Sequence, residues 1–186
     1  MEIQGKSYII CGATRTGKST LLFKLLKLIK KIDLIFVYTS TGYEWLHVKK
    51  AIVLGFDQLE KVDLLFHEKL KPLNKVIVID NFIGEKKIKL PVIDKIYTSG
   101  RHYGITCFIL TQYISGHITP VVRDNTNYYF IMRTKIRTYE ILFEQQNYYT
   151  KKKDFIDYCL KNQKKYNPIL IDNYNLELEN NIILLK

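Results

Sequence analysis

Cysteine, glycine and proline are all scarce in this chain of 186 residues. The three cysteines, Cys11, Cys107 and Cys159, are odd in number and far apart, so we expect neither a disulfide framework nor a CxxC metal site. Such cysteine usage indicates a reducing compartment. Nine glycines and four prolines without a period exclude a collagen-like or low-complexity chain.

Long apolar runs are also missing. A membrane-spanning helix needs roughly 18 or more uninterrupted apolar residues, and the longest candidate, Leu21–Val37, contains four lysines and an aspartate. The first six residues, Met1–Lys6, lack the apolar segment of a signal peptide. We therefore expect a soluble intracellular protein with no membrane span.

Arginine and acidic residues are few beside the lysines. Lys and Arg total 29 against 18 Asp and Glu, a formal net charge of +11, and only five of the 29 are Arg. This charge attracts polyanions but carries no information about the fold. Contact with nucleic acid and the lysine-rich composition of an AT-rich genome explain it equally well. Ordinary shares of hydrophobic (47%) and charged (25%) residues exclude a mostly disordered chain.

Short apolar runs alternate with stretches of helical periodicity along the chain. We expect strands at Ser7–Cys11, Asp33–Tyr38, Ala51–Leu54, Val76–Asp80, Ile105–Leu110, Tyr128–Met132 and Pro168–Ile171. We expect helices at Lys18–Lys31, Phe56–Leu70, Pro91–Ser99, Thr138–Tyr148 and Lys153–Lys164. This alternation predicts an α/β fold, with a mostly parallel sheet covered by helices on both faces. Because no internal repeat or linker interrupts it, residues 1–186 are expected to form a single domain.

A phosphate-binding motif joins the first expected strand to the first expected helix. Gly12–Ser19 matches GxxxxGK[ST] in full, which is the P-loop or Walker A pattern. Glycines let backbone N–H groups wrap a phosphate, and the following helix presents its positive N-terminus. In this pattern Lys18 reaches the β- and γ-phosphates and the Ser19 hydroxyl holds Mg²⁺, so we expect ATP and Mg²⁺ as cofactors. The nucleotide-binding residues are expected to be Gly12, Ala13, Thr14, Arg15, Thr16, Gly17, Lys18, Ser19 and Thr20.

A carboxylate, Asp80, ends the apolar strand that follows the second expected helix. Beside a P-loop, an Asp in this place matches Walker B and supports Mg²⁺. The next residue is Asn81, and an amide cannot accept a proton from water. Asn81 is then expected only to position the attacking water, and the general base is Glu44, Glu85 or Asp80 itself.

Two further segments complete a recognisable pattern. Ser99–Gln112 places an Arg just past a helix and ends a buried strand in Thr-Gln, and Thr119–Asn125 carries an Arg-x-Asn element. Together with the two Walker motifs, they resemble the FtsK/HerA superfamily of DNA-pumping ATPases. The resemblance is strongest to the genome-packaging ATPases of nucleocytoplasmic large DNA viruses and related double-jelly-roll viruses, over about Tyr8–Met132. It implies a RecA-like P-loop fold of the ASCE type and an ATPase that moves double-stranded DNA.

The resemblance also implies roles for residues outside the Walker motifs. Gln112 corresponds to the polar residue that senses the γ-phosphate or orients the attacking water. Arg101 corresponds to the arginine finger that reaches the nucleotide of a neighbouring subunit. Arg123 is either a second cation acting across the interface or part of a structural ion pair. At Asn81 the sequence departs from the family, which commonly has an acid there.

The partners implied by the resemblance are double-stranded DNA, further copies of the chain in a ring of five or six, and a capsid or vertex protein. The compartment implied is the host cytoplasm or the virion. Lysines that either contact DNA or form solvated faces are Lys86, Lys87, Lys89, Lys151, Lys152, Lys153, Lys161, Lys164 and Lys165. His102 and His117 lack the spacing of a metal-binding pair, so they are expected to be structural or surface residues.

The alternatives to a DNA-translocating ATPase are a small P-loop kinase and a nucleotide-binding scaffold that does not hydrolyse ATP.

Overall fold

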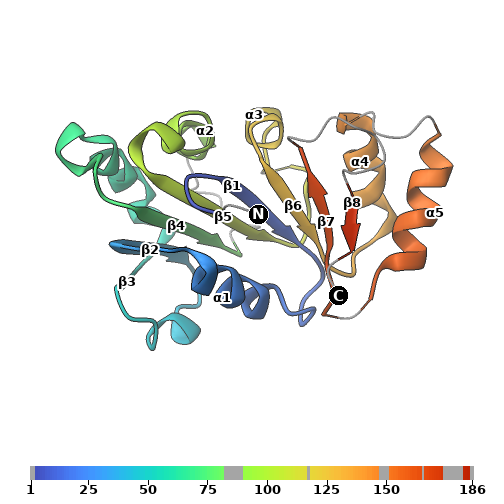
Figure 1. The fold of residues 1–186 in the computed structure, drawn as a ribbon, viewed down its shortest axis with the longest axis horizontal. Helices are drawn as coiled ribbons and strands as arrows, with labels where there is room; N and C mark the ends of the chain where they lie inside the picture. The colour runs from blue at the N-terminus through green and yellow to red at the C-terminus, as the bar shows by residue number, and fades with distance from the viewer. Residues whose placement is uncertain are drawn as a thin grey trace.

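The chain folds around one central β-sheet (Figure 1). The computed structural model describes residues 3–81, 90–116, 118–146, 151–164, 166–173 and 182–184. Within these residues, eight strands form the sheet in the order β3-β2-β4-β5-β1-β6-β7-β8. The strands are β1 (Ser7–Cys11), β2 (Leu34–Thr39), β3 (Ala51–Leu54), β4 (Lys75–Asp80), β5 (Ile105–Thr111), β6 (Tyr128–Ile131), β7 (Ile169–Asp172) and β8 (Ile182–Leu184).

The strands β3, β2, β4, β5, β1 and β6 run parallel, which confirms the predicted mostly parallel α/β sheet. β7 pairs antiparallel with β6, and β8 pairs antiparallel with β7. The reversal at β7 follows from the connection, because two helices lie between β6 and β7 in the chain. One helix returns the chain to a parallel strand, whereas two successive helices bring it back in the opposite direction. β8 was not among the expected strands.

Helices cover both faces of the sheet, as predicted (Figure 1). They are α1 (Lys18–Leu28), α2 (Leu90–Ser99), α3 (Pro120–Asp124), α4 (Ile136–Gln146) and α5 (Lys152–Asn162), with 3₁₀ helices η1 (Tyr43–Trp45), η2 (Phe56–Phe66), η3 (Glu68–Leu70) and η4 (Gly100–Tyr103). Apolar residues of α1 and η1 pack on one face, against Tyr8 and Ile10 of β1. Those of η2, α2, α3, α4 and α5 pack on the other face, against Ile9 and Cys11.

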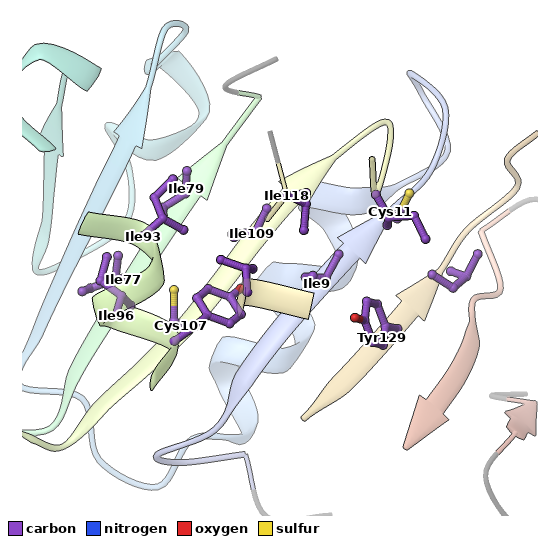
Figure 2. Close-up of a cluster of buried hydrophobic side chains, with 14 of the residues drawn as sticks. Ile9, Cys11, Ile77, Ile79, Ile93, Ile96, Cys107, Ile109, Ile118 and Tyr129 are labelled. Carbon is purple, nitrogen blue, oxygen red and sulfur yellow. The ribbon is translucent and has the colours of Figure 1, made fainter. Parts of the chain in front are cut away.

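The core on the α2 face is built from the strand residues that alternate toward it (Figure 2). Successive side chains of a strand point to opposite faces, so every second residue of β1, β4 and β5 enters this layer. The buried side chains drawn there include Ile9, Cys11, Ile77, Ile79, Cys107 and Ile109 from the sheet and Ile93 and Ile96 from α2. All of them are at most 2% exposed, which gives the sheet a rigid centre from which its loops extend.

The helix predicted at Phe56–Leu70 is present, but it is of the 3₁₀ type and is interrupted at His67. The segment forms the 3₁₀ helix η2, then His67 in an extended conformation, then the short η3. The buried residues of η2 are Phe56, Leu59, Val62 and Leu65, which recur at every third position. This spacing matches the three residues per turn of a 3₁₀ helix and not the 3.6 of an α-helix.

Other helix boundaries differ by a few residues. α1 ends at Leu28 and not at the expected Lys31, because Ile29 is extended (φ −76°, ψ 120°) and its side chain is buried in the core. The helix α3 was not expected, although Pro120 at its first turn and Thr119 as N-cap are start signals. The Thr119 hydroxyl accepts from the backbone N–H of Val122 at 3.1 Å. Tyr148, the expected end of α4, lies outside the described residues.

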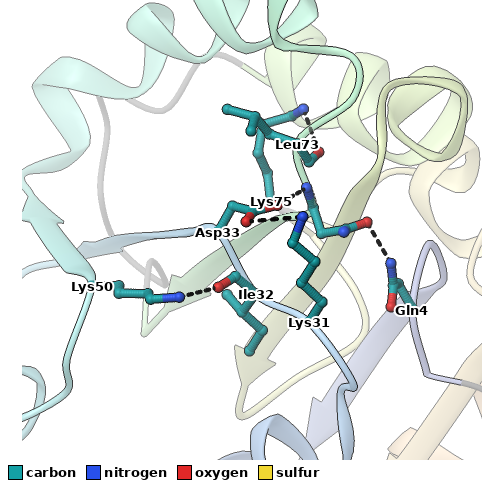
Figure 3. Close-up of polar contacts among 8 residues, drawn as sticks. Gln4, Lys31, Ile32, Asp33, Lys50, Leu73 and Lys75 are labelled. Carbon is teal, nitrogen blue, oxygen red and sulfur yellow. Dashed lines mark hydrogen bonds and ion pairs between the residues drawn. The ribbon is translucent and has the colours of Figure 1, made fainter.

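A polar cluster holds the amino-terminal end of β4 (Figure 3). Lys75 is fully buried, and its ammonium donates to the backbone carbonyls of Leu70 and Leu73, the latter at 2.9 Å. Asp33 accepts from the backbone N–H of Asn74 at 2.9 Å. These contacts join β4 to the segments before β2 and β4, at the sheet edge opposite Asp80.

Among the described helices, none combines the length and apolar character needed to cross a membrane.

Candidate functional site

The carboxyl ends of the central strands meet at one edge of the sheet. In the strand register Cys11 lies beside Thr111, and Asp80 lies beside Leu110 and Thr39. Parallel pairing therefore brings together three segments that are far apart in the sequence: the loop after β1, the last residue of β4 and the residue after β5. The crevice at the carboxyl ends of the strands is where open α/β sheets bind their ligands.

One cavity of about 650 Å³ lies at this edge. Its volume is within the usual range of small-molecule sites. The residues that line it are Thr14, Arg15, Gly17, Lys18, Ser19, Thr20, Thr41, Glu44, Asp80, Asn81, Gln112 and Tyr166. The structure thus brings both Walker motifs, Gln112 and the candidate base Glu44 together, as the sequence predicts, and adds Thr41 and Tyr166.

The loop after β1 has the backbone shape of an anion-binding nest. Arg15 and Gly17 both have positive φ, 61° and 97°, and such alternation turns successive N–H groups toward one concavity. Glycine is also required at position 12, where a Cβ would lie 2.5 Å from Cβ of Met132. The Thr16 hydroxyl is turned inward, where it donates to the Ala13 carbonyl at 2.7 Å. Gly12 and Thr16 therefore shape the loop and do not line the cavity.

Lys18 lies over the same loop. Its ammonium donates to the carbonyls of Gly12 at 2.8 Å and Ala13 at 3.0 Å. Burial lowers the pKa of Lys18, while nearby Cys11 and Asp80 act to raise it. The ammonium is thus positioned between the loop and Asp80, where phosphate oxygens would replace carbonyls as its acceptors.

Three side chains whose oxygen atoms can bind a cation lie together beside Lys18: Asp80, Ser19 and Glu44. Asp80 is only 6% exposed, and burial raises the pKa of its carboxyl to about 6, with the charge of Glu44 adding to the rise and Trp45 and Lys18 opposing it. The Ser19 hydroxyl donates to Oε1 of Glu44 at 3.2 Å. Hydroxyl and carboxylate oxygens are the ligands that Mg²⁺ takes, usually one or two from protein with waters and phosphates completing its shell.

The described residues contain no cluster of three or more His, Cys, Asp or Glu that could hold a metal ion by themselves. The Ser19 hydroxyl and Asp80 supply two protein oxygens, a number that suits a Mg²⁺ ion completed by phosphates and waters. The glycine-shaped loop, the Ser19 hydroxyl and Asp80 together suit Mg²⁺ bound to a nucleotide.

Asn81 has a backbone reason to be asparagine. Its φ is +56°, and its N–H donates to the carbonyl of Leu110 at 3.1 Å. This left-handed conformation is unfavourable for most side chains, and Asn is among the residues that tolerate it best. The exposed Asn81 side chain lines the cavity beside Asp80.

Arg101 does not lie in this cavity. It is on η4, before β5, whereas Gln112 follows β5, and a seven-residue strand between them spans roughly 20 Å. Arg101 is exposed, donates to Nε2 of His102 at 3.3 Å, and lines a separate cavity of about 220 Å³ together with Lys6 and Asp124. An Arg101 side chain therefore cannot reach the P-loop of its own chain.

The remaining candidates take structural or surface positions, or lie outside the described part of the chain. Arg123 donates to the carbonyl of Ile118 at 2.7 Å and is half-buried, which favours a structural role in holding the segment before α3. His102 is exposed, as expected. Outside the described residues are Glu85, Lys86, Lys87, Lys89, His117 and Lys165.

Sequence reasoning missed several residues around the 650 Å³ cavity at the P-loop, called the nucleotide cavity below. Tyr166 and Thr41 belong to no motif, and only the fold brings them to the P-loop. An adjoining cavity of about 480 Å³ shares Thr14 and Gln112 with the first and adds Arg133 and Lys135. The Arg133 carbonyl accepts from the N–H of Ala13 at 3.0 Å, so this loop after β6 is fixed against the P-loop.

No protein-family model matches the chain, and no curated protein sequence does. Several solved structures do. The genome packaging NTPase B204 from Sulfolobus turreted icosahedral virus 2, in complex with AMPPCP, matches with a TM-score of 0.70 and 19% identity over 98% of each chain. B204, the DNA-packaging ATPase from Sulfolobus turreted icosahedral virus, matches with a TM-score of 0.70 and 19% identity over 99% of this chain and 98% of that one.

The pCW3 conjugation coupling protein TcpA, solved with ATPγS, matches with a TM-score of 0.64 and 15% identity, over 97% of this chain and 60% of that one. These similarities extend well beyond the Walker motifs and include the strands on both sides of them. The chain therefore has an α/β P-loop NTPase fold similar to that of these packaging and coupling proteins, which confirms, at the level of the fold, the resemblance to FtsK/HerA-like packaging ATPases.

Proposed function

We propose that this chain is an Mg²⁺-dependent ATPase that translocates double-stranded DNA and packages a viral genome into a capsid. The observation that carries the proposal is the single cavity that joins the P-loop, Asp80 and Gln112. It is supported by the similarity, over nearly the whole chain, to packaging NTPases solved with nucleotide analogues.

Each residue at the cavity has a physical task in phosphoryl transfer. The P-loop N–H groups and Lys18 bind the phosphates, and Ser19 and Asp80 hold the magnesium ion. When bound, Mg²⁺ neutralises negative charge on the β- and γ-phosphate oxygens. Gln112, at the end of the strand beside Asp80, orients the attacking water by hydrogen bonding.

Glu44 is the carboxylate that we assign as general base. Of the two candidates that the structure describes, Asp80 is committed to the metal. Glu44 lines the cavity and is exposed, and its Oε1 lies 3.2 Å from the Ser19 hydroxyl. It can therefore accept a proton from water next to the γ-phosphate, which the Asn81 amide cannot do.

Assembly is part of the proposal because Arg101 cannot reach its own cavity. Arg101 can then stabilise charge in the transition state only at the cavity of a neighbouring copy, and a closed ring of five or six subunits supplies one such Arg101 to every site. Such a ring works in the host cytoplasm or in the virion, and it docks on a capsid or vertex protein.

Contact with DNA is supported by the net charge of +11. In and beside α5, Lys151, Lys153, Lys161 and Lys164 are exposed, whereas Lys152 forms an ion pair with Glu144 at 2.9 Å. Lysines that contact phosphates bind DNA of any sequence, which suits a motor that moves along the duplex.

The test measures ATP turnover with and without duplex DNA. We expect DNA to stimulate turnover, DNA binding to weaken steeply as salt rises, and Lys18→Ala to abolish hydrolysis. Lys24→Ala is the matched control, since Lys24 is an exposed lysine of the same helix. Turnover by Lys18→Ala at the wild-type rate would contradict the site. A phosphorylated small-molecule product would favour a kinase, and nucleotide binding without turnover would favour a scaffold.

A further inference from the structure

Tyr166 is held in a strained turn at the mouth of the nucleotide cavity. The turn lies between α5 and β7, and it is closed by a bridge between Lys164 and Asn167. Tyr166 has a φ of +68°, in the left-handed region that aromatic residues rarely adopt. Strain of this kind persists where the surrounding structure enforces it, and it concentrates at ligand sites.

The ring of Tyr166 lies directly against the P-loop. A Cβ placed on Gly17 would be 2.9 Å from Cδ1 and 3.6 Å from Cε1 of Tyr166, so one side of the ring contacts the Gly17 backbone. Even so, Tyr166 is 59% exposed. It lines the same cavity as Lys18, Ser19 and Thr20. The ring is therefore supported by the Gly17 backbone and also faces the cavity.

The position of the ring relative to the phosphate groups identifies what it would contact. Lys18 and Asp80 mark the end of the cavity that takes the β- and γ-phosphates. Gly17 opens α1, whose first N–H groups face the α- and β-phosphates. A nucleoside attached to the α-phosphate leaves the loop past the start of α1, and this is where the ring of Tyr166 lies.

We propose that Tyr166 is the stacking platform for the purine base of the nucleotide. The proposal rests on the proposed function, because it assigns a role within the same cavity. An aromatic ring offers a flat apolar surface to the face of a base, and its support by the Gly17 backbone fixes its orientation before the ligand arrives. Stacking tolerates different bases, so adenine and guanine nucleotides bind alike, and the smaller pyrimidines bind more weakly.

The test compares ATP with inorganic triphosphate, which has the phosphates but no base. Tyr166→Ala is expected to weaken ATP binding by about 5-fold or more, since a stacked base is worth that much on removal of the ring. Its affinity for inorganic triphosphate stays at the wild-type value. Tyr166→Phe keeps the ring and binds ATP like the wild type, whereas Tyr166→Gly relieves the left-handed strain and still loses ATP affinity.

Tyr113→Ala is the matched control, because Tyr113 is another exposed tyrosine but lines the adjoining cavity. It is expected to bind both ligands like the wild type. Equal weakening of ATP and triphosphate by Tyr166→Ala would overturn the assignment, because the ring would then only shape the P-loop. If the wild type hydrolyses ATP and Tyr166→Ala binds ATP as tightly as the wild type, the role of Tyr166 is overturned and the proposed function is not. A wild-type protein that binds neither ligand would overturn the proposed function as well.

Discussion

Asp80 carries a buried carboxyl whose protonation changes close to neutral pH. Burial and the neighbouring charge of Glu44 raise its pKa to about 6. In the proposed function Asp80 holds Mg²⁺, and only its ionised form can do so, so protonation competes with binding of the metal and its nucleotide. The acid dependence of the whole activity should therefore follow this one group.

We expect kcat/KM for ATP to fall about tenfold per pH unit below about 6 and to level off above it, because this ratio reports the free enzyme.

The stability of the fold should change with pH in the opposite sense to the activity. The folded chain retains a proton on Asp80 between about pH 4 and 6 that the unfolded chain has lost, so the free energy of unfolding declines as pH rises through this window.

Asp80→Asn removes the buried charge and should abolish turnover while stabilising the protein at pH 7 by up to about 3 kcal/mol. Chemical denaturation at pH 7 and at pH 4 measures this difference, which should nearly vanish at the lower pH. Equal stability of the variant and the wild type at pH 7 would show that the pKa of the Asp80 carboxyl is not raised in the folded chain.

Glu44 has two separable effects. If it is the general base, Glu44→Gln should lower kcat by roughly 10²- to 10⁴-fold with little change in ATP affinity. The same substitution removes a negative charge beside Asp80, so the acid limb of the pH profile should move to lower pH. Glu68→Gln, an exposed acid on η3, is the control. A large loss of ATP affinity in Glu44→Gln would indicate a binding role in place of base catalysis.

At the scale of elements, β4 is fixed by different chemistry at its two ends. The carboxyl end presents Asp80 to the cavity, and the amino end holds the buried Lys75. Burial lowers the pKa of Lys75, and nearby Asp33 acts to raise it. Its ammonium satisfies carbonyls of the segment after η2, so the lysine joins this connection to the sheet.

Lys75→Ala should destabilise the fold by about 2–4 kcal/mol, because a fully buried side chain is removed and the carbonyls of Leu70 and Leu73 lose their donor. Lys71→Ala is the control, since Lys71 makes an exposed ion pair with Glu68 at 3.6 Å and a cation–π contact with Tyr103, the loss of which should together cost about 1 kcal/mol or less. Urea denaturation measures both. The nucleotide affinity of folded Lys75→Ala should stay at the wild-type value, because the strand separates Lys75 from Asp80.

At the scale of the whole molecule, the proposed function makes catalysis a property of the assembly, because Arg101 lies too far from the P-loop of its own chain to act there. Arg101→Ala should bind ATP almost normally and lose most DNA-stimulated turnover, since a finger is worth roughly 10³–10⁵ in rate where chemistry limits. Lys18→Ala should fail at its own cavity but still offer an intact Arg101 to its neighbour. Arg137→Ala, an exposed arginine on α4, controls for loss of surface charge.

Mixing Arg101→Ala with Lys18→Ala subunits should restore part of the turnover. A mixed ring contains interfaces at which an intact P-loop meets an intact Arg101, although neither variant is active alone. Steady-state turnover of the mixture, with sizing to show that mixed oligomers form, is the measurement. Absence of recovery in such oligomers would rule out action of Arg101 across the interface.

Local patterns determined much of the fold. The expected strands are all present within one or two residues of their predicted ends, because an apolar run between turn signals depends on neighbours in the sequence. The P-loop was identifiable for the same reason, since its glycines, Lys18 and Ser19 are contiguous. The η2 segment was predicted as a helix, and the three-residue spacing of its apolar positions is the sequence signal that distinguishes its 3₁₀ type.

What the tertiary structure alone decided is which distant segments meet. Sheet order and register, set by side-chain packing between strands, bring Glu44 and Tyr166 to the P-loop and leave Arg101 at the opposite edge. The direction of β7 likewise follows from two helices packing in succession after β6. By itself the sequence determined the phosphate-binding chemistry, because that chemistry resides in adjacent backbone groups. The residues around it depend on contacts over long sequence separations, which no local pattern records.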